Sequence, residues 1–589
     1  MGKCSSCTFC EDCSRESSLG FSEKSVLGKY TTNKNNFLDS QISPLSTSLG
    51  FNKTVKLNNQ VSLDNIRFSQ KEKREFEEKL KLKKSKSQDK SCKIISRNGK
   101  HQIDLSGNSK HQIDLSGISL SISISNRLFI NQLNDSPEKK YKFIDIIGTG
   151  SFGTVYLAQN LYTKEKVAIK KIKKSIADYL SDGEILDEIE ILKNLEHPDI
   201  VKIIEFYNTE NAFYIVNEYC QYGELYDQVS NKLSEIQICV IFRQILSGLA
   251  YLHSNNVAHR DLKLENIMIS DIEYVRVKKE KYFDIKIIDF GTARIFDKNK
   301  TGKAIVGSCY YIAPEVLKKK YNTECDLWSA GVILYMLLVG IPPFDGETNS
   351  EIISKVKKGI FNNKAKRYIN ASNEVKDLIS KLLVYDPSKR LTAIQALRHP
   401  WFDVTNWTLL YYNIPKKGII QCVQNLLSYK IKSKFEELVL AYIIHNMSKL
   451  KEAKTIIKLF KLVNIRGDGR LQKDELKKAL LNFVSDDYLI NYDEIFNLLD
   501  GDNNGYIDYE EFFRGALDRK SVLNRDVLIY AFNFFDKDNS GYINREKIKP
   551  YFIDSTIDEE MFEIIFNEID TNGDGKIDFN DFINMMIYD

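Results

Sequence analysis

Five short motifs, which follow one another between Gly148 and Glu315, constrain the fold of this chain more than any other feature of its sequence. The first two lie among strand-like runs such as FIDIIG and KVAIKKI, and the third follows a long helical segment, SEIQICVIFRQILSGLAYLH. This change from short strand-like runs to long helical segments predicts a small β-rich lobe that leads into a larger helical lobe. The motifs are GTGSFGTV (Gly148–Val155), VAIK (ending at Lys170), HRDLKLEN (His259–Asn266), DFG (Asp289–Gly291) and APE (Ala313–Glu315).

The glycine-rich motif predicts a phosphate-binding turn between two strands. Its pattern, GxGxxGxV, lets backbone amides close over the phosphates of a nucleotide. Glycine turns between strands are common, so this motif gains weight only because Lys170 of VAIK follows it, placed to pair with the phosphates. Glu188 lies on a predicted helix and is expected to position that lysine. The expected nucleotide contacts are Gly148, Gly150, Gly153, Val155, Lys170 and Glu188.

Over residues 141–402 the chain resembles the protein kinase family, because all five motifs occur in the order that the family has. The resemblance implies that Asp261 orients the substrate hydroxyl and takes its proton. It also implies that Asn266 and Asp289 hold Mg²⁺, and that Lys263 neutralises charge on the phosphoryl group transferred from ATP. Lys263 stands two residues after Asp261, which is similar to serine/threonine kinases rather than tyrosine kinases.

Substrate choice and activation can also be compared with the family. Glu224 and Glu265 match positions that often hold a basic substrate residue, which predicts a preference for Arg or Lys upstream of the phosphorylated residue. The alternative interpretation is that these carboxylates only bind ribose or are solvated. The position at which many relatives carry an activating phosphothreonine is Ala304, so Arg260 would lack its usual phosphate partner there. An inactive kinase fold that serves as a scaffold is the alternative function, and the intact catalytic residues argue against it.

Glycine-centred acidic loops recur in the last part of the chain and form an internal repeat of helix, loop and helix. The four loops begin at Asn464, Asp500, Asp536 and Asp570, at spacings of 36, 36 and 34 residues. They match the calcium-loop pattern, in which positions 1, 3, 5, 7, 9 and 12 supply ligands around a glycine at position 6. We number these loops first to fourth in chain order.

The second loop, DGDNNGYIDYEE, matches the calcium pattern throughout, and the fourth loop, DTNGDGKIDFND, nearly does. The fourth closes with an aspartate, whose shorter side chain reaches a large ion less easily, so its preference for Ca²⁺ over Mg²⁺ is expected to be weaker. The predicted ligands are Asp500, Asp502, Asn504, Tyr506 (carbonyl), Asp508 and Glu511, then Asp570, Asn572, Asp574, Lys576 (carbonyl), Asp578 and Asp581.

The third and first loops depart from the pattern. The third places Lys547 where a carboxylate should close the site, and the first carries Asn464 at position 1 and Arg466 at position 3. We expect the first loop to bind no calcium and the third to bind it at most weakly, so both serve mainly as structural partners. All four loops keep glycine at position 6 and a branched apolar residue at position 8, so the first is expected to brace the second and the third to brace the fourth. The weaker ligands of the third loop are Asp536, Asp538, Ser540 and Tyr542.

Between the two modules, residues 423–447 carry apolar side chains at helical spacing, with Lys430, Lys432 and Lys434 among them. An apolar helix face with basic flanks suits both a calmodulin-like groove and the acidic cleft of a kinase. An ordinary packed connector is the alternative interpretation.

The order of kinase domain, junction and four calcium loops resembles the calcium-dependent protein kinases of plants and protists, over residues 141–589. This resemblance implies that the junction holds the kinase shut at low calcium and that calcium-loaded loops release it. The expected fold class is multidomain α+β: a bilobal kinase fold followed by an all-α, calmodulin-like EF-hand domain. The predicted divisions are residues 1–140 (extension), 141–402 (kinase), 403–450 (junction) and 451–589 (EF hands), with ATP, Mg²⁺ and Ca²⁺ as cofactors.

The N-terminal extension is rich in Ser, Asn and Lys, and residues 14 to about 135 are expected to be mostly disordered. It begins MGKCSSCTFCEDC, which fits N-myristoylation at Gly2 with palmitoylation at Cys4 as the second signal that stable anchoring needs. A zinc or iron–sulfur site at these cysteines is the rival interpretation. The lipid interpretation predicts a cytoplasmic protein associated with a cytosol-facing membrane.

Charge and composition exclude some classes of protein. The 84 basic and 80 acidic residues leave a net charge of +4, which gives no reason to expect a nucleic-acid partner. The ten cysteines show no pairing rhythm outside the first thirteen residues, as expected for a reducing compartment. No apolar run approaches the length of a membrane-spanning helix, and no signal-peptide core is present, so neither a span nor secretion is expected.

Overall fold

The structure is a computed structural model of the chain. It describes residues 129–130, 132–133, 135–150, 153–174, 182–231, 233–275, 280–296, 301–404, 416–430, 433–446, 453–482, 491–552, 559–570 and 572–587. The predicted lipidation residues Gly2 and Cys4 lie outside this part of the chain, as do Lys432 and Met447 of the junction.

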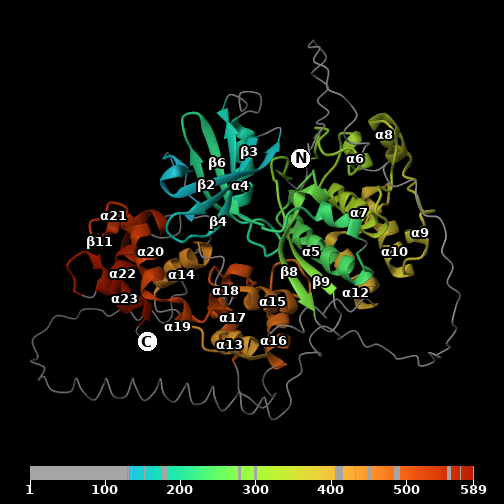
Figure 1. Ribbon diagram of the computed structural model, residues 1–589. Helices are drawn as coiled ribbons and strands as arrows, with labels where there is room; N and C mark the ends of the chain where they lie inside the picture. Colours follow the sequence, from blue (N-terminus) through green and yellow to red (C-terminus); the bar gives the residue numbers. More distant parts are fainter. Residues whose placement is uncertain are drawn as a thin grey trace, which may run out of the picture.

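A six-stranded sheet with one helix forms the N-terminal lobe of the kinase (Figure 1, blue to cyan). The strand order is β1-β5-β6-β4-β3-β2, and all neighbours are antiparallel except the pair β1 and β5. Ala158, Ile169 and Val216, one from each central strand, are fully buried in its core. The elements are β1 (Gln132–Leu133), β2 (Tyr141–Gly150), β3 (Gly153–Asn160), β4 (Lys166–Lys173), α4 (Asp182–Lys193), β5 (Ile203–Asn208) and β6 (Ala212–Glu218).

The C-terminal lobe is mainly helical and packs around α5 and α7. Trp328 of α7 and Trp401 of α12 are fully buried in its core. Its helices are α5 (Glu235–Ser254), α6 (Pro314–Leu317), α7 (Glu324–Val339), α8 (Asn349–Lys358), α9 (Lys366–Ile369), α10 (Asn373–Leu382), α11 (Ala393–Leu397) and α12 (Pro400–Val404), and its strands are β7 (Val257–Ala258), β8 (Ile267–Val275), β9 (Glu280–Ile287) and β10 (Arg294–Ile295).

Helix α5 explains why a long apolar helix here need not be a membrane span. It is the one helix among the described residues whose length and composition alone would allow it to cross a bilayer, yet 72% of its most apolar window is buried inside the protein. Its start is fixed by a capping box, in which Ser234 and Gln237 bond each other's backbone amides. The helix is therefore the core helix of the C-terminal lobe.

The EF-hand module is entirely helical apart from short loop pairings. β11 (Tyr542–Ile543) pairs with β12 (Ile577–Asp578), and a bridge joins Leu471 to Ile507, which confirms that the third loop pairs with the fourth and the first with the second. The predicted fold class is confirmed as well. The helices are α15 (Ala453–Val463), α16 (Lys473–Leu481), α17 (Tyr492–Leu499), α18 (Tyr509–Ala516), α19 (Arg519–Val522), α20 (Arg525–Phe535), α21 (Arg545–Ile548), α22 (Glu559–Ile569) and α23 (Phe579–Ile587).

The junction differs from the single helical face that the sequence predicts. It forms two helices, α13 (Lys416–Leu427) and α14 (Lys434–Asn446). Ser428 folds its hydroxyl back to the carbonyl of Gln424 near the end of α13, and the Ser433 hydroxyl accepts from the Glu436 amide to cap the start of α14. A serine in this role begins a new helix, and the spacing of apolar residues does not reveal it.

The described part of the kinase sheet also begins before the predicted boundary at Tyr141. β1 extends the kinase sheet through a parallel pairing with β5. Phe129 is 5% exposed, and its ring lies 5.4 Å from that of Tyr442 and 6.0 Å from that of Phe534. The last residues of the predicted extension therefore join the kinase sheet to the junction and the EF hands.

Candidate active site and calcium loops

Three predicted residues from separate elements meet at one ion-pair cluster between the lobes. The Lys170 ammonium on β4 lies 2.9 Å from Glu188 Oε1 of α4 and 3.2 Å from Asp289 Oδ1 of the DFG motif. Burial alone lowers the pKa of Lys170, but Asp289 and Glu188 together raise it above its usual value. The lysine is therefore a fixed positive charge at neutral pH, as a phosphate contact requires.

A second cluster holds the predicted catalytic carboxylate. Asp261 Oδ2 lies 2.7 Å from the Lys263 ammonium, and Asp261 Oδ1 accepts from the amide and hydroxyl of Ser308 at 2.9 and 2.8 Å. The Asn266 side-chain amide donates to the Asp261 carbonyl at 2.9 Å. Ser308 belongs to the segment between DFG and APE. That segment therefore helps to orient the Asp261 carboxylate by bonding Oδ1, the oxygen that Lys263 does not contact.

A buried aspartate that the sequence analysis missed supports this loop. Asp326, at the start of α7, is 1% exposed and accepts from the backbone amides of His259 and Arg260 at 2.9 Å each. Arg260 has a φ of +68°, which costs energy in a non-glycine residue unless its surroundings hold it. The only sequence signal for this role is a carboxylate inside the otherwise apolar run DLWSAGVILYMLLVG.

The glycine-rich turn fits a nucleotide. A Cβ at Gly153 would lie 2.2 Å from the Lys171 carbonyl oxygen, so only glycine fits there, whereas a Cβ at Gly150 would meet no described atom within 4 Å. β3 and β4 place Val155 directly opposite Lys170. The open turn, the Lys170 ammonium and the Asp289 and Asn266 oxygens together suit a magnesium–nucleotide complex.

The second calcium loop fits a cation. Carboxylate oxygens of Asp500, Asp502 and Glu511 all lie within 4.8 Å of one another. Burial and the neighbouring charge of Asp508 raise the pKa of Glu511 to about 9. A group of three crowded carboxylates, two of them buried, suits Ca²⁺, which takes oxygen ligands.

The fourth loop has the same backbone arrangement around its first ligand. Asp570 accepts from the Gly575 amide at 2.7 Å, as Asp500 does from Gly505 at 3.1 Å. The closing residue Asp581 is 6% exposed and accepts from the Asp578 amide at 3.3 Å. The oxygen ligands of the fourth loop thus fit a cation. The loop closes with the short side chain of Asp581, as the sequence predicts.

The third loop is occupied by the side chain of its own closing residue. The Lys547 ammonium lies 2.7 Å from Asp536 Oδ1, 2.5 Å from Asp538 Oδ1, 2.7 Å from the Ser540 hydroxyl and 2.8 Å from the Tyr542 carbonyl. These are the four ligands predicted for this loop, so a cation of the chain itself already holds them. The hydrogen bond from Lys547 lowers the pKa of Asp538.

The first loop is occupied in a different way. The Arg466 amide donates to Glu475 Oε1 at 3.0 Å, and its guanidinium lies 3.3 Å from Asp474. The loop also docks on the kinase: the Ser247 hydroxyl of α5 donates to the Gly467 carbonyl at 2.8 Å. This agrees with the expectation that the first loop serves a structural purpose.

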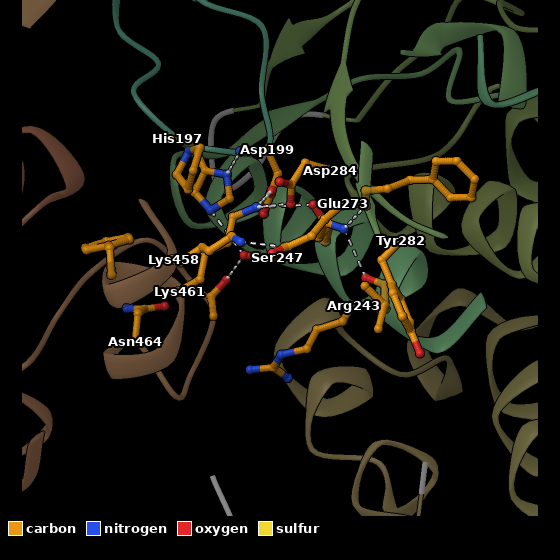
Figure 2. Close-up of a pocket in the computed structure, with 16 residues that line it drawn as sticks. His197, Asp199, Arg243, Ser247, Glu273, Tyr282, Asp284, Lys458, Lys461 and Asn464 are labelled. Carbon is orange, nitrogen blue, oxygen red and sulfur yellow. Dashed lines mark hydrogen bonds and ion pairs between the residues drawn. The ribbon is translucent and has the colours of Figure 1, made fainter. Parts of the chain in front are cut away.

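Helix α15, which leads into the first loop, carries lysines that meet acidic residues of the kinase domain. Figure 2 shows two of these pairs: the Lys461 ammonium lies 2.5 Å from Asp199, and Lys458 lies 2.5 Å from Glu273. Lys454 lies 2.6 Å from Asp271. Asp199 is 1% exposed, so its contact with Lys461 is a buried ion pair. The EF-hand module is therefore fastened to the kinase by charge as well as by its loop.

The fold and these two kinds of site define the class of protein: a protein kinase catalytic domain joined to paired EF hands. Residues 141–402 match the family model described as protein kinase domain, and residues 453–517 and 525–587 each match the model described as EF-hand domain pair.

The chain is also similar to curated proteins over most of its length. It is 37% identical to calcium-dependent protein kinase 4 of Plasmodium falciparum (isolate 3D7), over 78% of this chain and 88% of the relative. It is 35% identical to calcium-dependent protein kinase 3 of Plasmodium berghei (strain Anka), over 79% of this chain and 83% of the relative. The chain belongs to the calcium-dependent protein kinase family. It is a calcium-dependent serine/threonine protein kinase.

Proposed function

We propose that calcium in the second and fourth loops activates this kinase by holding the junction helix α14 inside the EF-hand module. Without calcium the hands release α14, and the junction holds the kinase shut. The observation that carries this proposal is the burial of α14: its residues from Phe435 to His445 are all buried. A helix enclosed in this way cannot at the same time occupy the substrate cleft.

Aromatic contacts hold α14 in the C-terminal pair of hands. Phe435 is fully buried, and its ring lies 5.2 Å from that of Phe535 and 6.2 Å from that of Phe582. The ring of Tyr442 stacks on that of Phe534 at 4.0 Å. Both α20 and α23 carry residues of this cluster, so a change in the angle between the hands would open it.

Buried charges add a contact with the second hand. Glu437 of α14 lies 2.8 Å from Arg514 of α18, and both side chains are 3% exposed. Arg514 is one turn from Glu511, the closing residue of the second loop, at 4.0 Å. Calcium at Glu511 would therefore act on the same arginine that holds α14.

The catalytic roles follow from the two clusters of the active site. ATP and Mg²⁺, when bound, supply the phosphoryl group and neutralise charge on it. Lys170 binds phosphate oxygens while Glu188 holds the ammonium in place. Asp261 accepts the proton of the substrate hydroxyl, and its second oxygen is kept in position by Ser308. Lys263, 2.7 Å from Asp261, places positive charge where the phosphoryl group passes.

Substrate preference and membrane anchoring belong to the same proposal. Glu224 and Glu265 favour substrates with a basic residue near the phosphorylated serine or threonine, and burial raises the pKa of Glu265. Equal rates on a peptide with that basic residue replaced by alanine would contradict the preference. Lipid at Gly2 and Cys4 holds the kinase at a cytosol-facing membrane, and a native protein as soluble as its Gly2→Ala variant would contradict the anchor.

The experiment is phosphate transfer from Mg-ATP to a basic serine peptide at increasing free calcium, in the wild type and in Glu511→Gln. We expect activity that rises with calcium and needs more calcium in the variant. Activity that does not depend on calcium would remove the autoinhibition by the junction. No activity at any calcium concentration would favour the scaffold function.

A further inference from the structure

The third loop has the same backbone arrangement around its first residue as the second and fourth loops. Its Gly541 amide donates to Asp536 Oδ2 at 2.8 Å, as the corresponding glycine amides of the second and fourth loops do at 3.1 and 2.7 Å. Its strand β11 is paired with β12 of the fourth loop in register. The faulty closing residue has therefore not disrupted the loop.

The Lys547 ammonium stands where the loop would hold its ion. Four oxygen atoms surround the nitrogen at 2.5 to 2.8 Å, and they come from positions 1, 3, 5 and 7 of the loop. Two of them belong to the carboxylates of Asp536 and Asp538, whose negative charge the ammonium offsets. The backbone of Lys547 is fixed as well, because its amide donates to Asn544 Oδ1 at 3.1 Å and starts α21.

Calcium would gain little by replacing this ammonium. The ion needs six to eight oxygens and a bidentate carboxylate at position 12, and lysine supplies neither. To enter, calcium would have to move a charged nitrogen out of contact with four oxygens. It would then sit in a loop with two carboxylates and a displaced positive charge beside it.

We infer that the third loop takes its cation from its own chain: Lys547 fills the calcium position and keeps this hand closed at every calcium concentration. The C-terminal pair of hands, which encloses α14, then needs calcium only in the fourth loop. This consequence for α14 rests on the proposed function, whereas the occupancy of the loop does not. A test of calcium binding therefore separates the two.

The first test counts the calcium ions bound to the full-length chain by equilibrium dialysis at saturating calcium. We expect Asp536→Asn to bind as many as the wild type, because its loop takes none. Lys547→Glu restores the closing carboxylate and should bind one more, whereas Lys520→Glu, the same charge change at an exposed site on α19, should bind no more. An Asp536→Asn protein that binds one ion fewer would overturn the inference.

The second test examines the loop without calcium. In Lys547→Met the ammonium is lost and no carboxylate is gained, so the loop has no cation. Hydrogen exchange in excess chelator should then be at least tenfold faster at Gly541 and Ile543 than in the wild type. Equal exchange rates in the two proteins would show that Lys547 does not hold the loop closed. If Lys547→Met fails to fold, the number of calcium ions bound by the wild type and by Asp536→Asn in the first test still decides whether calcium occupies the third loop.

Discussion

At the scale of single residues, Tyr321 takes the place of the phosphate that Arg260 was expected to lack. The Arg260 guanidinium donates to the Tyr321 hydroxyl at 3.2 Å, and that hydroxyl donates to the Ala304 carbonyl at 2.9 Å. The Tyr321 carbonyl also accepts from the Gly302 amide at 2.8 Å. One tyrosine thus ties the segment between DFG and APE to the catalytic loop without a charged modification.

Tyr321→Phe should therefore lower kcat while leaving the KM for ATP unchanged. The ring remains, but the link from Arg260 to Ala304 is lost, and hydrogen bonds that include a charged group contribute about 1.5–3 kcal/mol. Since about 1.4 kcal/mol is tenfold in rate, we expect kcat to fall by roughly tenfold. Steady-state kinetics at saturating calcium measure this, with Tyr385→Phe, a partly exposed tyrosine, as the control. An unchanged kcat would contradict the role of the hydroxyl.

The APE motif provides a test of stability. Glu315 lies 2.6 and 3.1 Å from the two terminal nitrogens of Arg390, and both side chains are at most 5% exposed. Arg390→Ala leaves a buried carboxylate unpaired, which should cost about 3–5 kcal/mol. Lys381→Ala breaks an ion pair with Asp377 whose side chains are about half exposed, and should cost less than about 1 kcal/mol. Thermal unfolding of both variants measures the difference, and equal losses would be the contrary result.

Active-site residues could be predicted from the sequence only where they lie inside a recognisable short motif. Lys170, Asp261 and Asp289 were predicted because each lies inside a motif that is itself informative. Asp326 and Tyr321 were not, because each contacts Arg260 from 60 or more positions away and no short pattern includes both partners. The sequence shows that Lys547 departs from the calcium-loop pattern at position 12. Only the position of its ammonium among the loop oxygens in the structure indicates that it fills the loop.

At the scale of elements, α14 and α15 attach the EF hands to the rest of the chain by different means. α14 is held by aromatic packing and by the buried Glu437–Arg514 pair, and α15 by lysines paired with acidic residues of the kinase domain. The sequence predicts apolar helical periodicity in the junction but not its division at Ser433. It gives no sign of which surface of the kinase receives α15, because that choice depends on acidic residues brought together by the fold.

Phe435→Ala should weaken the hold on α14 and raise the calcium concentration needed for half-maximal kinase activity. Phe435 is fully buried, and removing such a ring costs about 3–5 kcal/mol. Ile529→Ala on α20 is the matched control, because Ile529 is 38% exposed and its truncation should change little. Activity measured against free calcium tests this, and a Phe435→Ala curve that matches the wild type would oppose it.

The contact between α5 and the first loop should depend on pH through His197. Its Nδ1 accepts from the Asp199 amide at 3.1 Å, and its Nε2 lies 3.2 Å from the Ser247 hydroxyl that bonds Gly467. Burial, with Lys461 and Lys286 nearby, lowers the pKa of His197 well below its usual value.

The folded protein therefore favours neutral His197. The resulting stability is complete above the unfolded pKa of about 6.5 and is lost as the pH falls below it. We expect the thermal midpoint to drop between about pH 6.5 and 5, and to drop less in His197→Gln. Part of the slope should remain, because burial also lowers the pKa of His445 in α14. Equal slopes in wild type and variant would exclude His197 as a cause.

At the scale of the whole molecule, the EF-hand module and the junction helix α14 together contact both lobes of the kinase (Figure 1). The first hand of the module meets the C-terminal lobe through Lys458 and Glu273. On the other side, His445 of α14 lies 3.2 Å from the Ile204 carbonyl of the N-terminal lobe, and Phe129 packs on α14 just before β1. The order of modules follows from the sequence, but these contacts do not, because each pairs surfaces from separately folded units.

This arrangement predicts that calcium removal exposes α14 and lowers activity together. The helix is enclosed by α18 and α20, and the Glu437–Arg514 pair lies beside the closing residue of the second loop. Hydrogen exchange over residues 434–446 should therefore be slow in saturating calcium and at least tenfold faster in excess chelator. Kinase activity should fall over the same range of free calcium.

Glu511→Gln separates the second loop from the others in the same experiment. If the second loop controls α14, the variant should need more calcium both to protect residues 434–446 and to activate the kinase, and the two curves should shift together. Because Lys547 fills the third loop, the amides of Gly541 and Ile543 should stay protected in chelator while those of α14 do not. Protection of α14 that persists in chelator while activity falls would place the control of the kinase outside this helix.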